Sequence, residues 1–447
     1  MITRLHLENF KAWKAVDLEF GQLTGIFGAN SAGKSSLFQF LLMLKQTRDT
    51  TDMEIALNLG EPHQLTDLGS FRDLVYAHDE SESVSWEIGW TGGAFRDEKT
   101  ALRLRSSVAL EGVNLETRRL WYTTPTYSIG IERPAGDDEY VLHDANGPIE
   151  LPFTSKPGPE VRPAKSYVLP VSMLLRLRRA TGPSGRRRPP YSSTHLPYAY
   201  ERLMDQIHYL GPLRDPPRRS YRFGGVRPSD VGIRGERTMD ALLAATLAEE
   251  ALADDDEAER SFQETIASWL QKMNLVHAFR LVPIGEYTNR WEARITSGPA
   301  GTETTLTDVG FGVSQVMPVL VLLYYVPKGS IVLLEQPEIH LHPSAQSVLA
   351  DVFLHAARTR GIQILVESHS EHLLRRIQRR RAEGAEGTDD VKLYFVSAGE
   401  SGARLNDLEL DRYGQIRNWP EHFFGDELGE VFAIQEAGMR RRMEEQA

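Results

Sequence analysis

The stretch Gly28-Ala29-Asn30-Ser31-Ala32-Gly33-Lys34-Ser35 decides the fold of this chain. It has the pattern of a phosphate-binding loop: a glycine, four residues, then Gly-Lys-Ser. A strand-like apolar run, Leu23 to Phe27, precedes it, and a helix-like run, Ser35 to Leu44, follows it. Glycines let backbone N–H groups face phosphate oxygens, and the helix directs the positive end of its dipole at the same place. The pattern predicts that Lys34 neutralises phosphate charge and that the Ser35 hydroxyl binds Mg²⁺.

The length and composition of the chain are those of an ordinary globular protein. Its 447 residues suffice for two or three domain-sized units, and 41% hydrophobic and 25% charged residues are typical values. The formal net charge of -11 means that the molecule as a whole does not attract nucleic acid or anionic membranes, although a local patch still could. The absence of cysteine excludes disulfides, thiolate metal sites and a cysteine nucleophile.

Neither a signal peptide nor a membrane span is expected. Charged residues interrupt the N-terminal segment from Met1 to Glu8, and two prolines and a lysine interrupt the most apolar region, Val316 to Leu334. That region is typical of a buried helix followed by a buried strand. We therefore expect a cytoplasmic protein that does not contact a membrane.

A second group of motifs lies in the last third of the chain. Ile331 to Glu335 is an apolar run that ends in an acid, as expected of a central parallel strand that places a carboxylate at its C-terminal edge. In a phosphate-loop enzyme such an acid holds Mg²⁺, directly or through water, opposite the loop serine. Ile362 to Val366 is another buried strand by its pattern, and Glu367-Ser368-His369-Ser370 follows it before a helix.

The segment Asp308 to Gln315 has glycines and a serine at the predicted start of an apolar helix. Such a helix start forms a second place able to hold a phosphate. Two phosphate-binding helix starts in one chain have two explanations. Either they converge within one molecule, or the second serves the nucleotide of a neighbouring copy.

The remaining pattern favours an antiparallel β-rich insertion between these two groups of motifs, followed by helices. Residues 239–273 are typical of two helices, with the acidic stretch Glu249 to Glu259 as a solvated turn between them. Further strands are predicted at Val84 to Trp90, Leu102 to Leu110, Arg118 to Tyr122, Tyr127 to Glu132, Ala278 to Val282 and Arg290 to Ile295.

Residues 170–237 are the most basic portion of the chain. One interpretation is contact with a nucleic-acid backbone, because arginine clusters neutralise phosphates. The other, which we favour because no aromatic stacking pattern or DNA-reading motif accompanies them, is a solvated or partner-pairing face. The arginines are Arg176, Arg178, Arg179, Arg186, Arg187, Arg188, Arg214, Arg218, Arg219, Arg222, Arg227, Arg234 and Arg237.

The order of motifs resembles the ABC-type ATPase heads of SMC, RecF-like and OLD-like proteins. The chain is most similar to the single-chain bacterial AAA-type ATPases of anti-phage defence loci that end in a domain of unknown function. That closer resemblance rests on Gln336 to Pro343, Tyr209 to Arg214, Trp419-Pro420 and Phe423-Phe424, and it covers essentially the whole chain.

The resemblance implies an α/β fold: a phosphate-loop NTPase of ABC-head type with a mixed sheet, an inserted antiparallel β-rich subdomain and a helical segment. The expected parts are an N-terminal ATPase lobe at 1–70, the β-rich insertion at 71–169, an arginine-rich helical segment at 170–273, the C-terminal ATPase lobe at 274–396 and an extension at 397–447.

The resemblance also implies residues that bind ATP and Mg²⁺. Lys11 to Trp13 would lie near the adenine, Gln64 would sense Mg²⁺ and the γ-phosphate, Glu335 would bind Mg²⁺, and His369 would be the switch histidine. The phosphates would be bound by Gly28, Ala29, Asn30, Ser31, Ala32, Gly33, Lys34, Ser35 and Ser36.

Heads of this kind form a dimer in which two monomers enclose two ATP molecules. By resemblance, Gly312, Ser314 and Gln315 would cap the γ-phosphate across that dimer interface, and His342 would occupy the loop between subunits. The expected partners are a second copy of the chain, or a larger assembly of copies, and a separately encoded effector such as a nuclease or toxin.

One departure from the family pattern concerns catalysis. These heads commonly place a second acid after the Mg²⁺-binding acid to orient the attacking water, and this chain has Gln336 there. An amide cannot accept a proton, so hydrolysis is expected to be slow unless Glu338 or another base substitutes. We expect a weak ATPase whose main output is nucleotide-gated closure and assembly.

Two functions remain open on the sequence. The first is regulation of an effector in anti-phage defence, and the second is a DNA-repair or recombination ATPase that clamps DNA through Arg176 to Arg237. A transport-coupled ABC subunit is disfavoured. Nuclease activity within the chain is not expected, because the segment from Lys392 to Ala447 is too short for the nuclease domain of OLD-like proteins.

Overall fold

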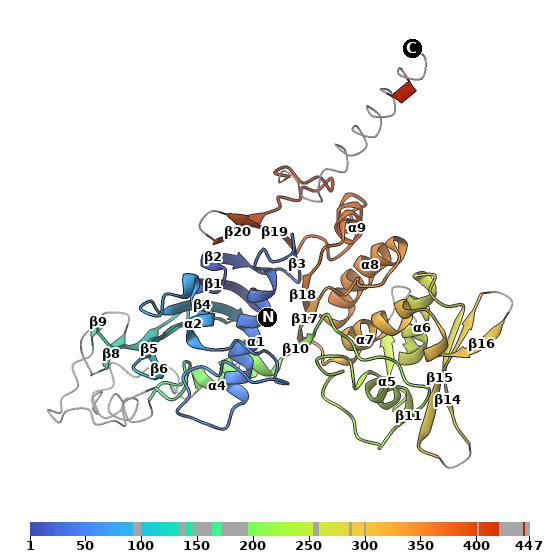
Figure 1. The fold of residues 1–447 in the computed structure, drawn as a ribbon, viewed down its shortest axis with the longest axis horizontal. Helices are drawn as coiled ribbons and strands as arrows, with labels where there is room; N and C mark the ends of the chain where they lie inside the picture. The colour runs from blue at the N-terminus through green and yellow to red at the C-terminus, as the bar shows by residue number, and fades with distance from the viewer. Residues whose placement is uncertain are drawn as a thin grey trace.

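The computed structural model describes residues 1–92, 100–134, 140–144, 147–148, 163–170, 195–253, 259–285, 288–298, 301–399, 402–419 and 441–442. Two large sheets dominate the molecule, with helices between and beside them (Figure 1). The fold is α/β with a mixed central sheet and a separate antiparallel sheet, as predicted.

The central sheet has six strands in the order β10-β17-β18-β3-β19-β20. The first five are parallel, and β20 pairs antiparallel with β19. Every residue of β17 and β18 is buried, which explains their nearly continuous apolar sequences, since both faces of this sheet are covered. The strands are β10 Ile207–Leu210, β17 Ile331–Glu335, β18 Gln363–Glu367, β3 Leu23–Gly28, β19 Val391–Gly399 and β20 Gly402–Asp407.

Alternate residues of the central strands enter two different hydrophobic cores. Ile331 and Leu333 belong to the core shared with α1 (Lys34–Asp49) and the antiparallel sheet. Val332 and Leu334 belong to the core built with the helices on the opposite face. The central sheet therefore lies between two helical layers, and its carboxyl edge is where side chains can reach a ligand.

The antiparallel sheet has eight strands in the order β2-β1-β4-β5-β6-β7-β8-β9. The predicted insertion strands are confirmed, but they continue a sheet that the N-terminal hairpin begins, because β1 pairs with β4. Leu5 faces Ile88 across that pair, and both are fully buried. The strands are β1 Ile2–Phe10, β2 Trp13–Glu19, β4 Val84–Thr91, β5 Ala101–Glu111, β6 Asn114–Thr123, β7 Ser128–Glu132, β8 Val141–Asp144 and β9 Gly147–Pro148.

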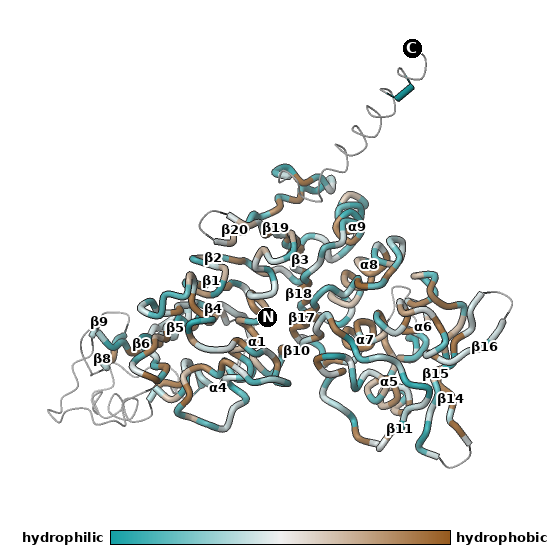
Figure 2. The backbone as a smooth tube through the Cα atoms, viewed as in Figure 1, coloured by the Kyte–Doolittle hydropathy of each residue, from teal (hydrophilic) through white to brown (hydrophobic). Residues whose placement is uncertain are grey.

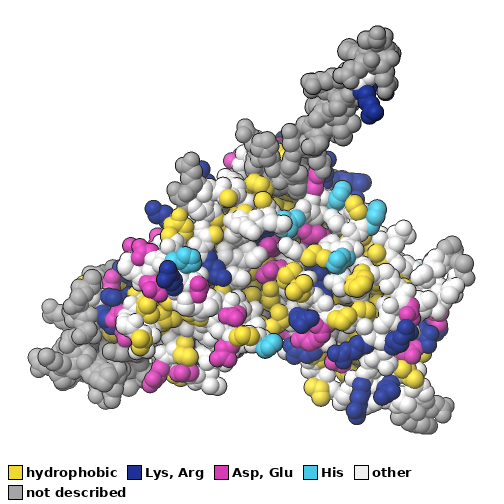
Figure 3. All heavy atoms as spheres, in the orientation of Figure 1, with side chains coloured by type: hydrophobic (Ala, Val, Ile, Leu, Met, Phe, Trp, Pro, Cys, Tyr) yellow, Lys and Arg dark blue, Asp and Glu magenta, His cyan; other side chains and the backbone are white. Residues whose placement is uncertain are grey.

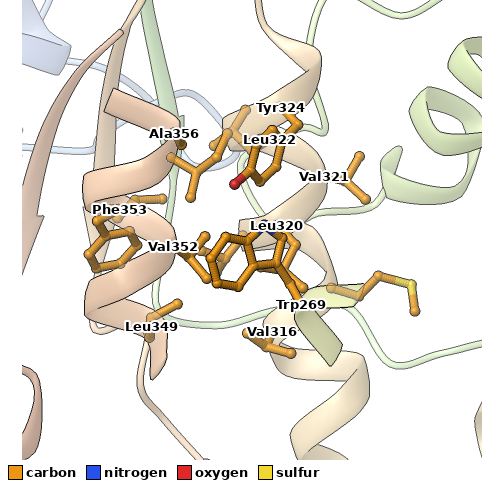
Figure 4. Packing of buried hydrophobic residues seen from close by; sticks show 14 of the residues in the cluster. Trp269, Val316, Leu320, Val321, Leu322, Tyr324, Leu349, Val352, Phe353 and Ala356 are labelled. Carbon is orange, nitrogen blue, oxygen red and sulfur yellow. The ribbon is translucent and has the colours of Figure 1, made fainter. Parts of the chain in front are cut away.

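Helices of the C-terminal half pack against the second face of the central sheet. Trp269 of α6 (Phe262–Lys272), Leu320 of α7 (Phe311–Tyr325) and Val352 of α8 (Pro343–Arg360) meet in this core (Figure 4). Figure 2 shows α7 as a largely hydrophobic segment, consistent with burial on all sides. The other α-helices are α2 Phe71–Leu74, α4 His195–Asp205, α5 Thr238–Leu247 and α9 Glu371–Ala382.

One connection differs from its prediction. The predicted solvated turn between α5 and α6 contains the hairpin of β12 (Ala251–Ala253) and β13 (Glu259–Ser261). A small sheet next to these helices comprises β11 Tyr221–Arg222, β14 Ala278–Pro283, β15 Arg290–Ser297 and β16 Thr302–Thr305. In the part of the chain that the structure describes, no helix has the length and apolarity needed to cross a membrane.

Candidate nucleotide-binding site

The predicted loop joins the end of β3 to the start of α1 at the carboxyl edge of the central sheet. Its backbone needs glycine at two positions, Gly28 with φ 145° and Gly33 with φ 105°. A Cβ atom at Gly28 would also lie 2.2 Å from the Val396 carbonyl oxygen. The buried side chain of Trp13 contacts the end of the loop. Its Nε1 donates to the Gly33 carbonyl at 3.1 Å and to Ser36 Oγ at 2.9 Å.

Lys34 is buried and its amine points back over the loop. The Nζ atom donates to the carbonyl oxygens of Gly28 at 3.1 Å and of Ala29 at 2.7 Å. Burial lowers the pKa of this amine, while the charge of Glu367 acts in the opposite direction. The loop thus holds its lysine inside the concave space that a phosphate would enter.

Two carboxylates meet at the ends of neighbouring strands beside this loop. Glu335 of β17 and Glu367 of β18 are partners in the register of the sheet. The Ser35 hydroxyl donates to Glu367 Oε1 at 2.9 Å, and the Tyr209 hydroxyl donates to Glu335 Oε1 at 3.0 Å. Burial, together with the charge of Glu367, raises the pKa of Glu335 to about 7. Burial also raises the pKa of Glu367, so the site favours a cation.

The predicted catalytic residues Gln336 and Glu338 follow β17. Gln336 has φ 44°, and its N–H donates to the Glu367 carbonyl at 2.8 Å. Glu338 is buried, and its Oε1 accepts from Ser368 Oγ and from the His369 N–H, both at 2.7 Å. Burial raises the pKa of Glu338. These two hydrogen bonds hold the turn after β18.

His369 reaches the loop from that turn. The residue is half-buried and forms a hydrogen bond with the backbone of Gly28. Burial, followed by the charge of Lys34, lowers the pKa of its imidazole. The structure therefore brings His369 together with the loop and the strand-end carboxylates.

Sequence reasoning missed three residues of this site: Tyr209, Arg214 and Glu367. Arg214 is buried, and its guanidinium donates to the Glu335 carbonyl at 3.4 Å. Burial lowers the pKa of Arg214 to about 10. Glu367 had a signal in the sequence, since it also ends an apolar strand. Tyr209 belongs to β10, and only the order of strands places it beside Glu335.

The second helix start, at the beginning of α7, is largely exposed. Gly310 is the N-terminal cap residue, and the side chain of Phe311 is 66% exposed. Ser314 and Gln315 are buried, and the Ser314 hydroxyl donates to the Phe311 carbonyl at 2.9 Å. Gly312 lies against the backbone of His340.

The turn after β17 continues this exposed surface. His340 and His342 are both exposed, and the ring of His340 lies 5.9 Å from that of Phe311 between centroids. His342 caps α8, with Nδ1 accepting from the Ser344 N–H at 3.3 Å. Together, Gly310, Phe311, Gly312, His340 and His342 make up the α7 face.

The structure does not bring Gln64 to the loop. Gln64 lines a hollow with Gln46, Asp49 and Thr50 beside the C-terminal end of α1. Because α1 has 16 residues, its two ends are about 24 Å apart. Gln64 is therefore not placed to sense Mg²⁺ at Ser35. Lys11, predicted near the adenine, donates through Nζ to Gln39 Oε1 at 2.8 Å.

The described arginines of the basic portion are mostly paired with acids. Figure 3 shows basic and acidic side chains intermingled over the lobe that carries α5 and β15. Arg176, Arg178, Arg179 and Arg186 to Arg188 lie outside the described residues. The ion pairs are Arg219–Asp308, Arg227–Glu250, Arg234–Asp215 and Arg237–Asp230.

Three family models match separate segments of the chain. A model described as AAA ATPase domain matches residues 236–374, and one described as AAA domain matches residues 4–78. A model described as protein of unknown function (DUF3696) matches residues 388–434. The two AAA matches include the loop, both acid-ending strands and the α7 face, so these segments carry the sequence features of an AAA ATPase domain. No curated protein matches the chain.

Solved structures of SMC heads match most of the chain at low sequence identity. The SMC head domain from Thermotoga maritima is 11% identical with a TM-score of 0.37, covering 91% of this chain and 99% of that chain. An Smc head bound to the C-winged helix domain of ScpA is 13% identical with a TM-score of 0.42, covering 92% and 98%. An Smc head domain with an extended coiled coil, bound to the C-terminal domain of ScpA derived from Pyrococcus furiosus, is 12% identical with a TM-score of 0.40, covering 92% and 96%.

Proposed function

Starting from an ATPase domain of AAA type, we propose that the chain binds ATP with Mg²⁺ at the loop, hydrolyses it slowly, and closes into a dimer around the nucleotide. In that closed state it controls a separately encoded effector, in keeping with the resemblance to anti-phage defence ATPases. The observation that carries the proposal is the position of Lys34 and Ser35. The lysine amine is held by loop carbonyls, and the serine hydroxyl faces a strand-end carboxylate.

The proposed residues for MgATP come from one edge of the central sheet. Backbone N–H groups of the loop and Lys34 would hold the phosphates, and His369 would contact the γ-phosphate side. Ser35 and the strand-end carboxylates would hold Mg²⁺, which supplies charge neutralisation and orientation of the phosphates when bound. The buried acids fit this group, because a divalent cation would offset the cost of burying their charges and the effect of the Glu367 charge on Glu335.

Slow hydrolysis is proposed from two neighbouring residues. Gln336 cannot accept a proton, and Glu338 already accepts two hydrogen bonds that hold the turn at Ser368. The position after the Mg²⁺-binding acid therefore carries no base, and Glu338 would have to substitute through Oε2, which has no hydrogen-bond partner among the described residues. Binding and closure, rather than rapid turnover, would be the main output.

Dimerisation is proposed from the α7 face. Phe311, a large exposed aromatic residue, lies at the start of α7 on the same face as the exposed His340 and His342. The Ser314 hydroxyl already donates a hydrogen bond within α7, to the Phe311 carbonyl. A second copy that carries bound nucleotide would cover Phe311 and place a phosphate at the helix start. Direct clamping of DNA is less favoured, because four of the described arginines, Arg219, Arg227, Arg234 and Arg237, are paired with acids.

The test is the mass of the purified full chain with and without ATP and Mg²⁺, measured together with phosphate release. A mass increase with ATP and slow release is the expected result. Brisk release without any change in mass would contradict closure as the output. Repeating the measurement with the product of a neighbouring gene tests for the effector, which should join the complex only in the closed state.

A further inference from the structure

The hydroxyl of Ser35 and one oxygen of Glu367 are spaced as two neighbouring ligands of one Mg²⁺ ion. We propose that Glu367, at the end of β18, is the carboxylate that binds Mg²⁺ directly, and that Glu335 acts from outside the metal's first set of ligands. This assignment rests on the proposed binding of MgATP. The expectation based on the sequence named Glu335 as the acid that holds Mg²⁺, directly or through water, and gave no role to Glu367.

The distance between the two oxygens is the first argument. Mg²⁺ binds six oxygens in an octahedron at about 2.1 Å, so adjacent ligand oxygens lie about 3 Å apart. Ser35 Oγ and Glu367 Oε1 are 2.9 Å apart. An ion placed between them could therefore bind both oxygens with little movement of either side chain. The serine proton that now occupies this contact would turn away from the metal.

The positions of the second oxygens are the next argument. Glu367 is 2% exposed, and its Oε2 has no hydrogen-bond partner among the described residues. A buried carboxylate oxygen without a partner is costly, and a cation or its bound water would satisfy it. Glu335, by contrast, is tied to Tyr209 through Oε1 at 3.0 Å. That hydrogen bond holds the Glu335 carboxylate toward β10, on the side of β17 that lies away from β18.

The number of protein ligands also suits Mg²⁺. Within the described ranges, no group of three or more His, Asp or Glu side chains is arranged to hold a metal ion. Mg²⁺ in nucleotide sites takes one or two carboxylates and completes its octahedron with phosphate oxygens and water. Ser35 and Glu367 would supply one edge of that octahedron, and ATP and water the rest.

A purely structural role for the Ser35–Glu367 hydrogen bond is the competing explanation. In that case the carboxylate would only hold the first turn of α1. Glu367→Gln keeps an oxygen that can accept the serine proton, so it preserves a structural hydrogen bond. The same change removes the negative charge that a metal requires.

The experiment measures Mn²⁺ binding to the full chain saturated with a non-hydrolysable ATP analogue, by loss of the paramagnetic resonance signal of free Mn²⁺. Nucleotide affinity is measured separately in excess EDTA. Glu367→Gln should weaken Mn²⁺ binding by about 10-fold or more, with nucleotide affinity in EDTA unchanged or improved. Glu335→Gln should weaken Mn²⁺ binding less.

The matched control is Glu87→Gln, which changes another poorly exposed strand glutamate remote from the loop, in β4, and should leave Mn²⁺ binding unchanged. If Glu367→Gln does not fold, Glu367→Asp is used instead. It keeps the negative charge, but its shorter side chain moves the carboxylate away from the metal and should weaken Mn²⁺ binding. A loss confined to Glu335→Gln, with the Glu367 variants within twofold of the wild type, would overturn the assignment. A wild-type chain that binds no nucleotide even in EDTA would instead overturn the proposed function itself.

Discussion

The two glycine-containing helix starts of this molecule have opposite surroundings. The loop before α1 is enclosed by its own chain: Trp13 supports it, Lys34 folds over it, and Glu367 faces Ser35. The start of α7 is exposed, and no acid stands opposite it in the described hydrogen bonds; its serine bonds to its own helix. Two glycine-containing helix starts thus form one site that is enclosed by its own chain and one exposed surface, which a second copy would cover in the proposed dimer.

The enclosed site should depend strongly on a single lysine. Lys34→Ala should weaken ATP binding by about 2–5 kcal/mol, because it leaves phosphate charge without its partner. Folding should change little, since the amine contacts only two loop carbonyls. Binding of a fluorescent ATP analogue measures the loss, and thermal unfolding measures the fold. Lys45→Ala, at the far end of α1, is the control, and its ATP affinity should match the wild type.

At the exposed α7 face, Phe311 should affect ATP-dependent dimerisation but not the binding of ATP to one chain. Phe311→Glu should leave ATP affinity of the monomer unchanged and weaken ATP-dependent dimerisation by about 2 kcal/mol, roughly 30-fold, as for a central aromatic contact. Sedimentation with and without ATP and Mg²⁺ measures this effect. Tyr413→Glu is the control, since Tyr413 is also exposed, at 64%. A dimer of unchanged stability would exclude the α7 face from the closure interface.

The acids of the enclosed site should make stability depend on pH. The pKa of Glu335 is raised from 4.5 to about 7, so the folded state holds a proton that the unfolded state releases. The free energy of unfolding should therefore fall as pH rises from about 4.5 to 7 and stay low above that. Glu335→Gln should raise the free energy of unfolding at pH 8 by about 1–3 kcal/mol in the absence of nucleotide.

Thermal unfolding, followed across this pH range for Glu335→Gln and for the wild type, measures the difference in their free energies of unfolding. Saturating MgATP should remove the difference, because a cation stabilises the charged acids of the wild type. The exposed residue Glu80 provides the control, and Glu80→Gln should show the same pH profile as the wild type. A Glu335→Gln profile parallel to that of the wild type would show that the pKa of Glu335 is not raised in the folded chain.

The smallest effect is expected beside the exposed site. Arg219 pairs with Asp308 just before α7, and 72% of its side chain is exposed. Arg219→Ala should lower the free energy of unfolding by less than about 1 kcal/mol, as for most surface ion pairs. It should not change binding to duplex DNA at low salt, measured by fluorescence anisotropy. A marked loss of salt-sensitive DNA binding would favour direct clamping of DNA over regulation of an effector.

Most of the elements could be predicted from local patterns. The strand before the loop, the apolar strands that end in Glu335 and Glu367, and the strands of the insertion are all confirmed. Two predictions differ from the structure, the first because of a local strand pairing and the second because of the path that the chain takes after α1. The hairpin between α5 and α6 replaced a turn, and Gln64 lies at the wrong end of α1.

The sequence by itself determined the loop, because a strand, a glycine-rich turn and a helix start lie within about twenty consecutive residues and need no distant partner. It also determined that two acids end buried strands. Only the tertiary structure decided which acid faces Ser35, because that depends on the strand order β17-β18-β3, which brings together residues 332 positions apart. The same strand order places β10 next to β17, so that the Tyr209 hydroxyl contacts Glu335. Strand order is fixed by the packing of both cores at once, and no single stretch of sequence carries it.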